Sequence, residues 1–321
     1  MKTVCMVLSA VMMVWLLGGC LADDVKKTDG VQAPAAAEKA SLAGDPVKID
    51  FKWSFKQQAA KSLFDKKDYP AAQKALEDLV ATAPNEGAKL ECLSLAAIAL
   101  GCQRQYDPAM QAAQRIPDAA LADYTRMEIM TVNGKNEELI AAYASKDFAA
   151  WPEDLRYKGY LKRGDAYIAL KNNRAAVRDL EQAAGQVGAK LDIQIWTLTR
   201  MGALYESLHE VDKALDAYRK GVSLAKNSDP WRGYWRYSTE AVVSAVRILV
   251  DRKKYDEALV IVAAYPPERD GIVTAPVAEA HGDVYAALGK KEEALSKYRE
   301  SLLTAGKPRV IGINKKMDAL K

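Results

Sequence analysis

The chain has 321 residues, half of them hydrophobic (50%), and a formal net charge of +4. Its 46 Lys and Arg residues are dispersed among 42 Asp and Glu residues, which is typical of a solvated helical surface rather than of a basic stripe for nucleic acid. We therefore expect no nucleic acid among its partners.

The first twenty residues have the features of a secretory signal. A basic start, Met1-Lys2, is followed by an apolar run from Val4 to Leu17 and then by Gly18-Gly19-Cys20. The run is shorter than the ~20 residues that a membrane-spanning helix needs. The Leu-Gly-Gly-Cys ending resembles the lipobox of bacterial lipoproteins. That resemblance implies removal of residues 1–19 and acylation of Cys20, with palmitate among two or three acyl chains; the alternative is an ordinary cleaved signal with an incidental Cys20.

Residues 20–50 form the next segment, and their composition predicts a flexible tether. They contain no aromatic residue and no sustained apolar periodicity, so they cannot bury a core. In a bacterium with two membranes, Leu21 rather than Asp after the lipidated Cys favours the outer membrane. We therefore expect a protein of the bacterial cell envelope, anchored through its N-terminal lipid and held off the membrane by a leash.

One pattern recurs three times with the same spacing in the folded region. A Gly is followed after 3 residues by Tyr, after 12 by Ala and after 16 by a large residue. The copies are Gly164, Tyr167, Ala176 and Leu180; Gly202, Tyr205, Ala214 and Tyr218; Gly282, Tyr285, Ala294 and Tyr298. Self-similarity at a fixed period indicates a stack of one structural unit.

The spacing fits a pair of packed helices. Gly and Tyr three residues apart share one helix face, and the Gly allows a second helix to approach closely, with Ala at the crossing and the large residue beside it. This pattern resembles the tetratricopeptide repeat. The resemblance implies an all-α fold, a right-handed α-solenoid of tandem helix–turn–helix repeats, over residues 51–305.

Weaker copies extend the array toward the N-terminus and fill its middle. The alanines at repeat position 20 are Ala72, Ala109, Ala176, Ala214, Ala258 and Ala294. The interval of 67 residues between Ala109 and Ala176 predicts a degenerate unit, which residues 119–147 supply as two helical stretches around Asn133-Gly134. The array therefore has six or seven repeats, followed by a basic tail or capping helix at 306–321.

The start of the folded region has two interpretations. Phe51, Trp53 and Phe55 alternate with polar residues, as in a short strand. Because the first repeat begins immediately downstream and offers no partner strand, we expect helix instead.

The cysteines and histidines point to no chemistry. Cys92 and Cys102 are ten residues apart on one predicted helix, a separation of about 15 Å that is too long for a disulfide, so we expect two free, buried thiols. His209 falls in a predicted turn and His281 at a packing position. No set of residues supplies a nucleophile, base and electrophile, so we expect no enzyme, no metal and no cofactor.

The first helix of each repeat offers a binding surface. In tetratricopeptide repeats, positions 5 and 9 of that helix point into the concave face. Here these positions carry a mixed set of charges: Lys61, Asp165, Arg247, Glu279 and Asp283. The Lys and Asn pair with which some relatives clamp a C-terminal carboxylate is missing from every repeat.

A second candidate is the cluster from Trp231 to Tyr237, at the head of a helix that runs to about Val250. The spacing of its two Trp residues favours packing on the preceding unit. Arg232, Tyr234, Arg236 and Tyr237 combine charge with aromatic rings, a composition enriched at binding hot spots.

These observations predict a non-catalytic, lipid-anchored adaptor for protein–protein interactions in an envelope complex. In joining a lipid anchor and leash to tandem repeats, the chain is similar to the lipoproteins of the outer-membrane barrel-assembly machinery. Two alternatives stay open: a surface lipoprotein that binds a glycan or small ligand, and a regulator of a cell-wall synthase.

Overall fold

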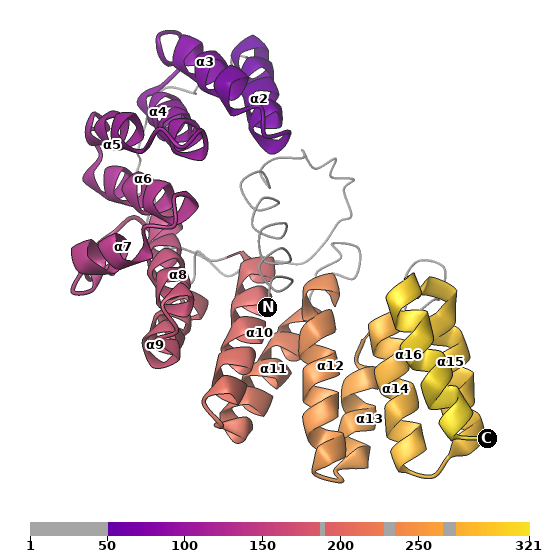
Figure 1. Cartoon of the computed structure of the whole chain (residues 1–321). Helices are drawn as coiled ribbons and strands as arrows, with labels where there is room; N and C mark the ends of the chain where they lie inside the picture. Colours follow the sequence, from indigo (N-terminus) through magenta and orange to yellow (C-terminus); the bar gives the residue numbers. More distant parts are fainter. Residues whose placement is uncertain (1–50, 187–189, 228–234, 266–273) are drawn as a thin grey trace, which may run out of the picture. The chain divides into compact units, whose positions relative to one another are not determined.

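The computed structural model describes residues 51–186, 190–227, 235–265 and 274–321, and every regular element in these ranges is an α-helix. The predicted all-α repeat fold is therefore confirmed. Figure 1 labels the helices as follows: α2 (Phe51–Asp65), α3 (Tyr69–Val80), α4 (Glu86–Cys102), α5 (Tyr106–Gln114), α6 (Ala119–Val132), α7 (Asn136–Tyr143), α8 (Glu153–Ala169), α9 (Asn173–Ala184), α10 (Leu191–Ser207), α11 (Val211–Lys226), α12 (Trp235–Asp251), α13 (Tyr255–Ala263), α14 (Ala275–Ala287), α15 (Lys291–Thr304) and α16 (Lys307–Ala319).

The chain divides into two compact units at Asn133 and Gly134. In the first unit, α2 packs on α3, α3 on α4, and α4 on both α5 and α6. In the second unit, α8 pairs with α9, α10 with α11, α12 with α13 and α14 with α15, while α12 also contacts α10 and α14. Helix pairs that share a core with their neighbours are typical of repeat proteins.

The crossing inside a pair has the geometry that the sequence predicts. A Cβ atom added to Gly202 would lie 2.4 Å from the Tyr218 ring, and one added to Gly282 would lie 2.6 Å from the Tyr298 ring. At Gly164 the nearest atom, on Leu180, is 3.2 Å away. The Gly therefore admits the large side chain of the second helix, most closely where that side chain is Tyr.

The turn between the two helices of a pair contains one residue with positive φ. In the three Gly-containing copies it lies seven residues after the Gly (171 − 164, 209 − 202 and 289 − 282), with φ of 60°, 61° and 73°. The next residue's amide donates to a carbonyl five residues back, as from Asn172 to Tyr167 at 2.8 Å, so the first helix ends in a Schellman motif. Equivalent residues are Lys67, Arg104, Gly134 and Lys253.

The structure confirms three predictions for individual segments. Residues 51–65 form helix α2, as expected, with Trp53 buried and donating from Nε1 to the Leu79 carbonyl at 3.3 Å. Residues 119–147 contain α6 and α7, with Gly134 in the left-handed turn between them. His209 lies in a turn, as predicted.

Both described thiols lie on α4 and are free, as predicted, but only Cys92 is fully buried. Cys102 is half-buried because it is the last residue of its helix and packs at the edge of the cluster around Phe64. Burial raises the pKa of each thiol to about 11. Both thiols are therefore poor nucleophiles at neutral pH.

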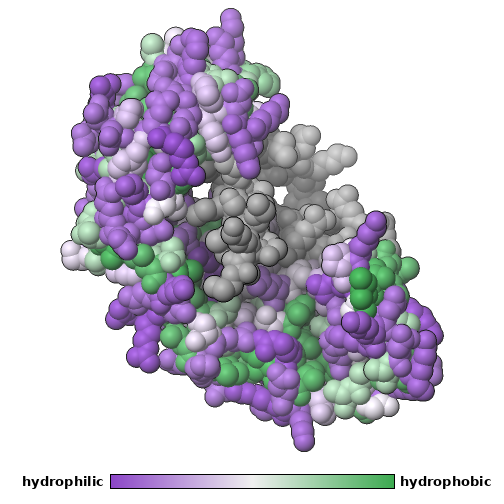
Figure 2. Space-filling view, in the orientation of Figure 1, coloured by the Kyte–Doolittle hydropathy of each residue, from purple (hydrophilic) through white to green (hydrophobic). Residues whose placement is uncertain are grey.

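In the view of Figure 2, most of the visible described surface is hydrophilic and the hydrophobic residues gather in small separate areas. Within the described ranges, no helix combines the length and the apolar character that crossing a bilayer requires.

Candidate functional site

The five charged residues predicted to line the concave, inner face all form ion pairs. Three of them pair with a neighbouring first helix, and Glu279 and Asp283 pair with α16. In the first unit, Lys61 on α2 places its Nζ 2.7 Å from Glu91 Oε1 on α4, and Gln57 donates to the other oxygen of Glu91 at 2.8 Å. Lys61 therefore helps to join two successive repeats.

The second unit repeats this arrangement with the signs exchanged. Asp165 on α8 accepts from Arg200 on α10 at 2.5 Å, and the Arg200 guanidinium lies 4.3 Å from the centre of the Trp196 ring. One repeat later, Glu206 on α10 pairs with Arg247 on α12. In both cases an acid on one first helix meets an arginine on the next.

Glu279 and Asp283 pair with α16, which follows the last repeat. Lys316 Nζ lies 2.8 Å from Glu279 and 2.7 Å from Asp283, and Arg309 lies 2.5 Å from Glu279. Burial alone would raise the pKa of Glu279, but its hydrogen bonds and ion pairs with Lys316 and Arg309 outweigh burial and lower that pKa. With Ile313 buried against the last pair, these contacts hold α16 in place.

These pairs change what a partner would meet on the inner face. The charges stay candidate contacts, but each already bridges two helices, so a partner must bind the bridge or compete with it. Sequence reasoning found one member of each pair and missed the other. A signal was present, because the opposite charge recurs 30 to 41 residues away, about one repeat along the chain.

The aromatic and arginine cluster falls largely on residues that the structure does not describe. Arg232 and Tyr234 lie outside the described ranges, as does the side chain of Arg236. Tyr237, in the first turn of α12, is 37% exposed. The hypothesis that this cluster binds a partner stays a prediction.

Arg163 is a buried charge that sequence reasoning did not single out. On α8, it donates to both oxygens of Asp179 on α9, at 2.8 and 2.7 Å, and to the carbonyls of Tyr143 and Lys146 at 2.8 and 2.6 Å. Its guanidinium also lies 4.8 Å from the centre of the Phe148 ring. Because the carbonyl acceptors close the C-terminal end of α7, Arg163 is a structural clamp between α7 and the α8–α9 pair.

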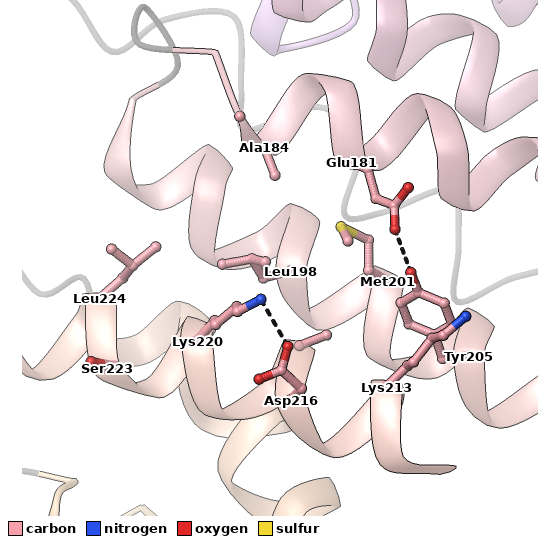
Figure 3. Close-up of a pocket in the computed structure, with 12 residues that line it drawn as sticks. Glu181, Ala184, Leu198, Met201, Tyr205, Lys213, Asp216, Lys220, Ser223 and Leu224 are labelled. Carbon is pink, nitrogen blue, oxygen red and sulfur yellow. Dashed lines mark hydrogen bonds and ion pairs between the residues drawn. The ribbon is translucent and has the colours of Figure 1, made fainter. Parts of the chain in front are cut away.

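An open hollow of about 690 Å³ lies on the second unit where α9, α10 and α11 meet. Leu198 and Met201 of α10 form its apolar floor, together with Ala217 of α11, as Figure 3 shows for the two larger side chains. The small residues Ala184 and Gly185 end α9 at its edge. The hollow therefore lies where α9 and α11 contribute the small residues Ala184, Gly185 and Ala217.

Charged residues of both signs surround that floor. Tyr205 donates to Glu181 at 2.5 Å, and Lys220 lies 2.8 Å from Asp216. Burial and the hydrogen bond to Glu181 strongly raise the pKa of Tyr205. Lys213 completes the rim, with its ammonium 5.6 Å from the centre of the Tyr205 ring. The hollow thus offers apolar contact at its centre and both donors and acceptors at its edge.

The described residues contain no cluster suited to binding a metal ion. No cluster of three or more His, Cys, Asp or Glu in the described ranges could hold a metal ion. His281 is half-buried on α14, stacked on Tyr285 at 4.8 Å, and burial lowers its pKa.

Solved structures resemble this chain only distantly. The C-terminal part of a repeat-containing protein from Cytophaga hutchinsonii is 15% identical over 80% of this chain and 98% of that chain, with a TM-score of 0.48. PilF from Pseudomonas aeruginosa is 12% identical over 85% of this chain and 99% of that chain, with a TM-score of 0.46. No curated protein matches the sequence.

Two family models match parts of the chain. Residues 157–185 match a tetratricopeptide repeat, and residues 236–321 match a tetratricopeptide repeat-like domain. The first segment spans α8 and α9 with the Gly164 crossing, and the second spans α12 to α16 with the Gly282 crossing. These two segments of the chain therefore contain tetratricopeptide repeats.

Proposed function

We propose that this protein is a lipid-anchored adaptor of the bacterial cell envelope, tethered through Cys20, that binds a protein or a peptide segment with its repeats. Tetratricopeptide repeats serve protein–protein interaction. The observation that carries the binding part of the proposal is the hollow between α9, α10 and α11, and the Leu17-Gly-Gly-Cys20 sequence supports the anchor.

The dimensions and lining of the hollow suit a peptide segment. Its volume of about 690 Å³ is within the range of roughly 300–1,000 Å³ that is usual for ligand sites. The apolar floor can take one or two apolar side chains of a partner. Because the rim offers Lys213 and Lys220 beside Glu181 and Asp216, flanking charges of either sign find a complement.

The location of the protein within the cell envelope is part of the same proposal. Leu21 after the lipidated Cys supports the outer membrane, and the union of anchor, leash and repeats supports a role in assembling outer-membrane proteins. The ion pairs of the inner face leave that surface as a second place of contact for the same or another partner.

The test combines two changes with affinity purification after crosslinking in cells. The intact mass of the mature wild-type chain should show acyl chains on Cys20, and Cys20→Ser should abolish them together with capture of envelope proteins. Ala184→Arg should fill the hollow and reduce capture of the partner on the order of tenfold or more. Gln182→Arg is the matched control, since Gln182 is exposed on the same helix and does not line the hollow.

Other outcomes would contradict the proposal in distinct ways. A mature chain without lipid would remove the anchor. Equal capture by wild type and Ala184→Arg would remove the hollow as the site. If nothing protein-like is enriched, the repeats serve a glycan or small ligand instead.

A further inference from the structure

The first helix of the array exposes two large aromatic side chains. Phe51 and Phe55 are 69% and 75% exposed, and four residues apart they share one face of α2. Trp53, between them in sequence, points the opposite way and is 6% exposed. The alternating aromatic residues, which in sequence resemble a strand, therefore lie on two sides of a helix: Trp53 is buried, and Phe51 and Phe55 are exposed.

The charges beside these aromatics are positive. Lys52 and Lys56 are exposed on the flank of the same face, also four residues apart, and among the described residues neither has an ion-pair partner. No acidic residue occurs in the first turn of α2. The only carboxylate of the helix, Asp65, is about 21 Å along the axis from Phe51. The start of the helix adds the positive end of its dipole.

Aromatic rings beside lysines match the interface of an anionic bilayer. Phe side chains enter the boundary between headgroups and acyl chains, while lysines extend along the surface toward the lipid phosphates. The other side of α2 is already occupied, because it packs on α3 and joins α4 through Gln57 and Lys61. The exposed face is thus free to contact lipid while the repeat stays intact.

The position of α2 in the chain also supports a bilayer as the partner of its exposed face. Phe51 follows Cys20 by 31 residues (51 − 20). The tether predicted from the composition of residues 20–50 would have a root-mean-square span of about 30 Å, which would keep α2 at millimolar effective concentration near the membrane that holds the lipid. At that effective concentration, even a weak intrinsic affinity of the exposed α2 face for lipid is sufficient for docking.

We propose that Phe51, Lys52, Phe55 and Lys56 form a docking face for an anionic phospholipid surface, so that α2 lies against the membrane to which Cys20 is anchored. This inference rests on the proposed lipid anchor, which supplies the high effective concentration. The lipid holds the chain at the membrane, and the face of α2 sets which side of the first repeat meets it.

An environment-sensitive fluorophore can test this docking in the lipidated protein. Ala59 is exposed on the same face of α2 and leaves both Phe residues in place, so Ala59→Cys carries the probe. Ala141→Cys is the matched control, an exposed alanine on α7. Cys92 and Cys102 will label slowly because their thiol pKa values are raised to about 11.

On vesicles of phosphatidylcholine and phosphatidylglycerol, emission from position 59 should shift to the blue and emission from position 141 should not. Phe51→Ser with Phe55→Ser should abolish the shift, and vesicles of phosphatidylcholine alone should weaken it. An unshifted probe at position 59, in a chain whose mass shows the lipid, would overturn the docking face and leave the anchor standing.

A second arm separates the two proposals. The mature chain with Cys20→Ser, added to the same anionic vesicles, should bind weakly, and the two Phe substitutions should reduce that binding on the order of tenfold. Val260→Ser is the control, because Val260 is also 69% exposed but shares its helix with Asp256 and Glu257 in the first turn. If the wild type carries no lipid and this binding persists, the anchor fails and the docking face stands. If the Phe substitutions instead convert a dimer to a monomer, a second copy covers the face and the inference is wrong.

Discussion

The crossing inside a helix pair and the junction between pairs are built from different residues. Inside a pair, Gly202 lets the Tyr218 ring approach the backbone, and the same solution recurs at Gly282. Between pairs, the contacts are individual: Arg163 with carbonyls of α7, Lys61 with Glu91, Glu279 with α16. The repeat motif thus specifies the helix pair, while individual charged side chains add to the apolar contacts that join one pair to the next.

The largest effect should come from breaking the Arg163 clamp, which joins α8 to α9 within a pair and joins that pair to α7. Arg163→Met keeps much of the side-chain volume but leaves Asp179 buried without its partner. It also removes the guanidinium donor from the carbonyls of Tyr143, Ala144 and Lys146. Breaking a buried ion pair in this way costs about 3–5 kcal/mol of unfolding free energy. Chemical denaturation should show it, and a loss below about 1 kcal/mol would mean that the clamp is not structural.

The crossings should respond according to how closely the rings approach. Gly202→Ala places a methyl group 2.4 Å from the Tyr218 ring, so it should destabilise by about 1–3 kcal/mol. Gly164→Ala meets Leu180 at 3.2 Å, and the better helix propensity of Ala, worth about 1 kcal/mol, should offset most of the strain. Equal melting temperatures for the two variants would contradict this account of the crossing.

Gly202 and Arg163 show which contacts can be predicted from the sequence and which cannot. The close approach at Gly202 was predictable because both partners lie within one repeat at fixed offsets. The acceptors of Arg163 were not, since backbone carbonyls leave no mark in a sequence. The hollow also escaped prediction, because it depends on the spacing of α9 and α11 and not only on the small size of Ala184 and Ala217. The position of α16 against Glu279 is likewise a long-range contact.

The junction at α16 should weaken in acid. Glu279 has a lowered pKa in the folded state, below its ordinary value of 4.5, so its stabilising contribution is present above that value and is lost as the pH falls through the folded pKa. Glu279→Gln should cost about 0.5–1 kcal/mol at pH 7, and the difference from wild type should vanish well below pH 4.5. Thermal unfolding of wild type and Glu279→Gln from pH 7 to below pH 4.5 measures this difference in stability. A difference that does not change with pH would exclude the ion pairs of Glu279 as its source.

The smallest effect should come from the turn inside a pair. Lys171 has a φ of 60°, which costs a side-chain-bearing residue about 1 kcal/mol, so Lys171→Gly should stabilise by about 0.5 kcal/mol after the larger entropy of Gly is counted. Gly289→Ala, at the equivalent position with a φ of 73°, should destabilise by about 1 kcal/mol. The two changes should therefore shift the melting temperature in opposite directions.

Site-specific photocrosslinking in cells tests the central claim most directly, that the repeats bind a partner in the hollow between α9, α10 and α11. A photoreactive amino acid at position 184 lies within the hollow, and one at position 182 lies on the exposed surface of the same helix. The account predicts a discrete adduct with an envelope protein from position 184 and a much weaker one from position 182. No adduct from position 184, or the same adducts from both positions, would contradict it.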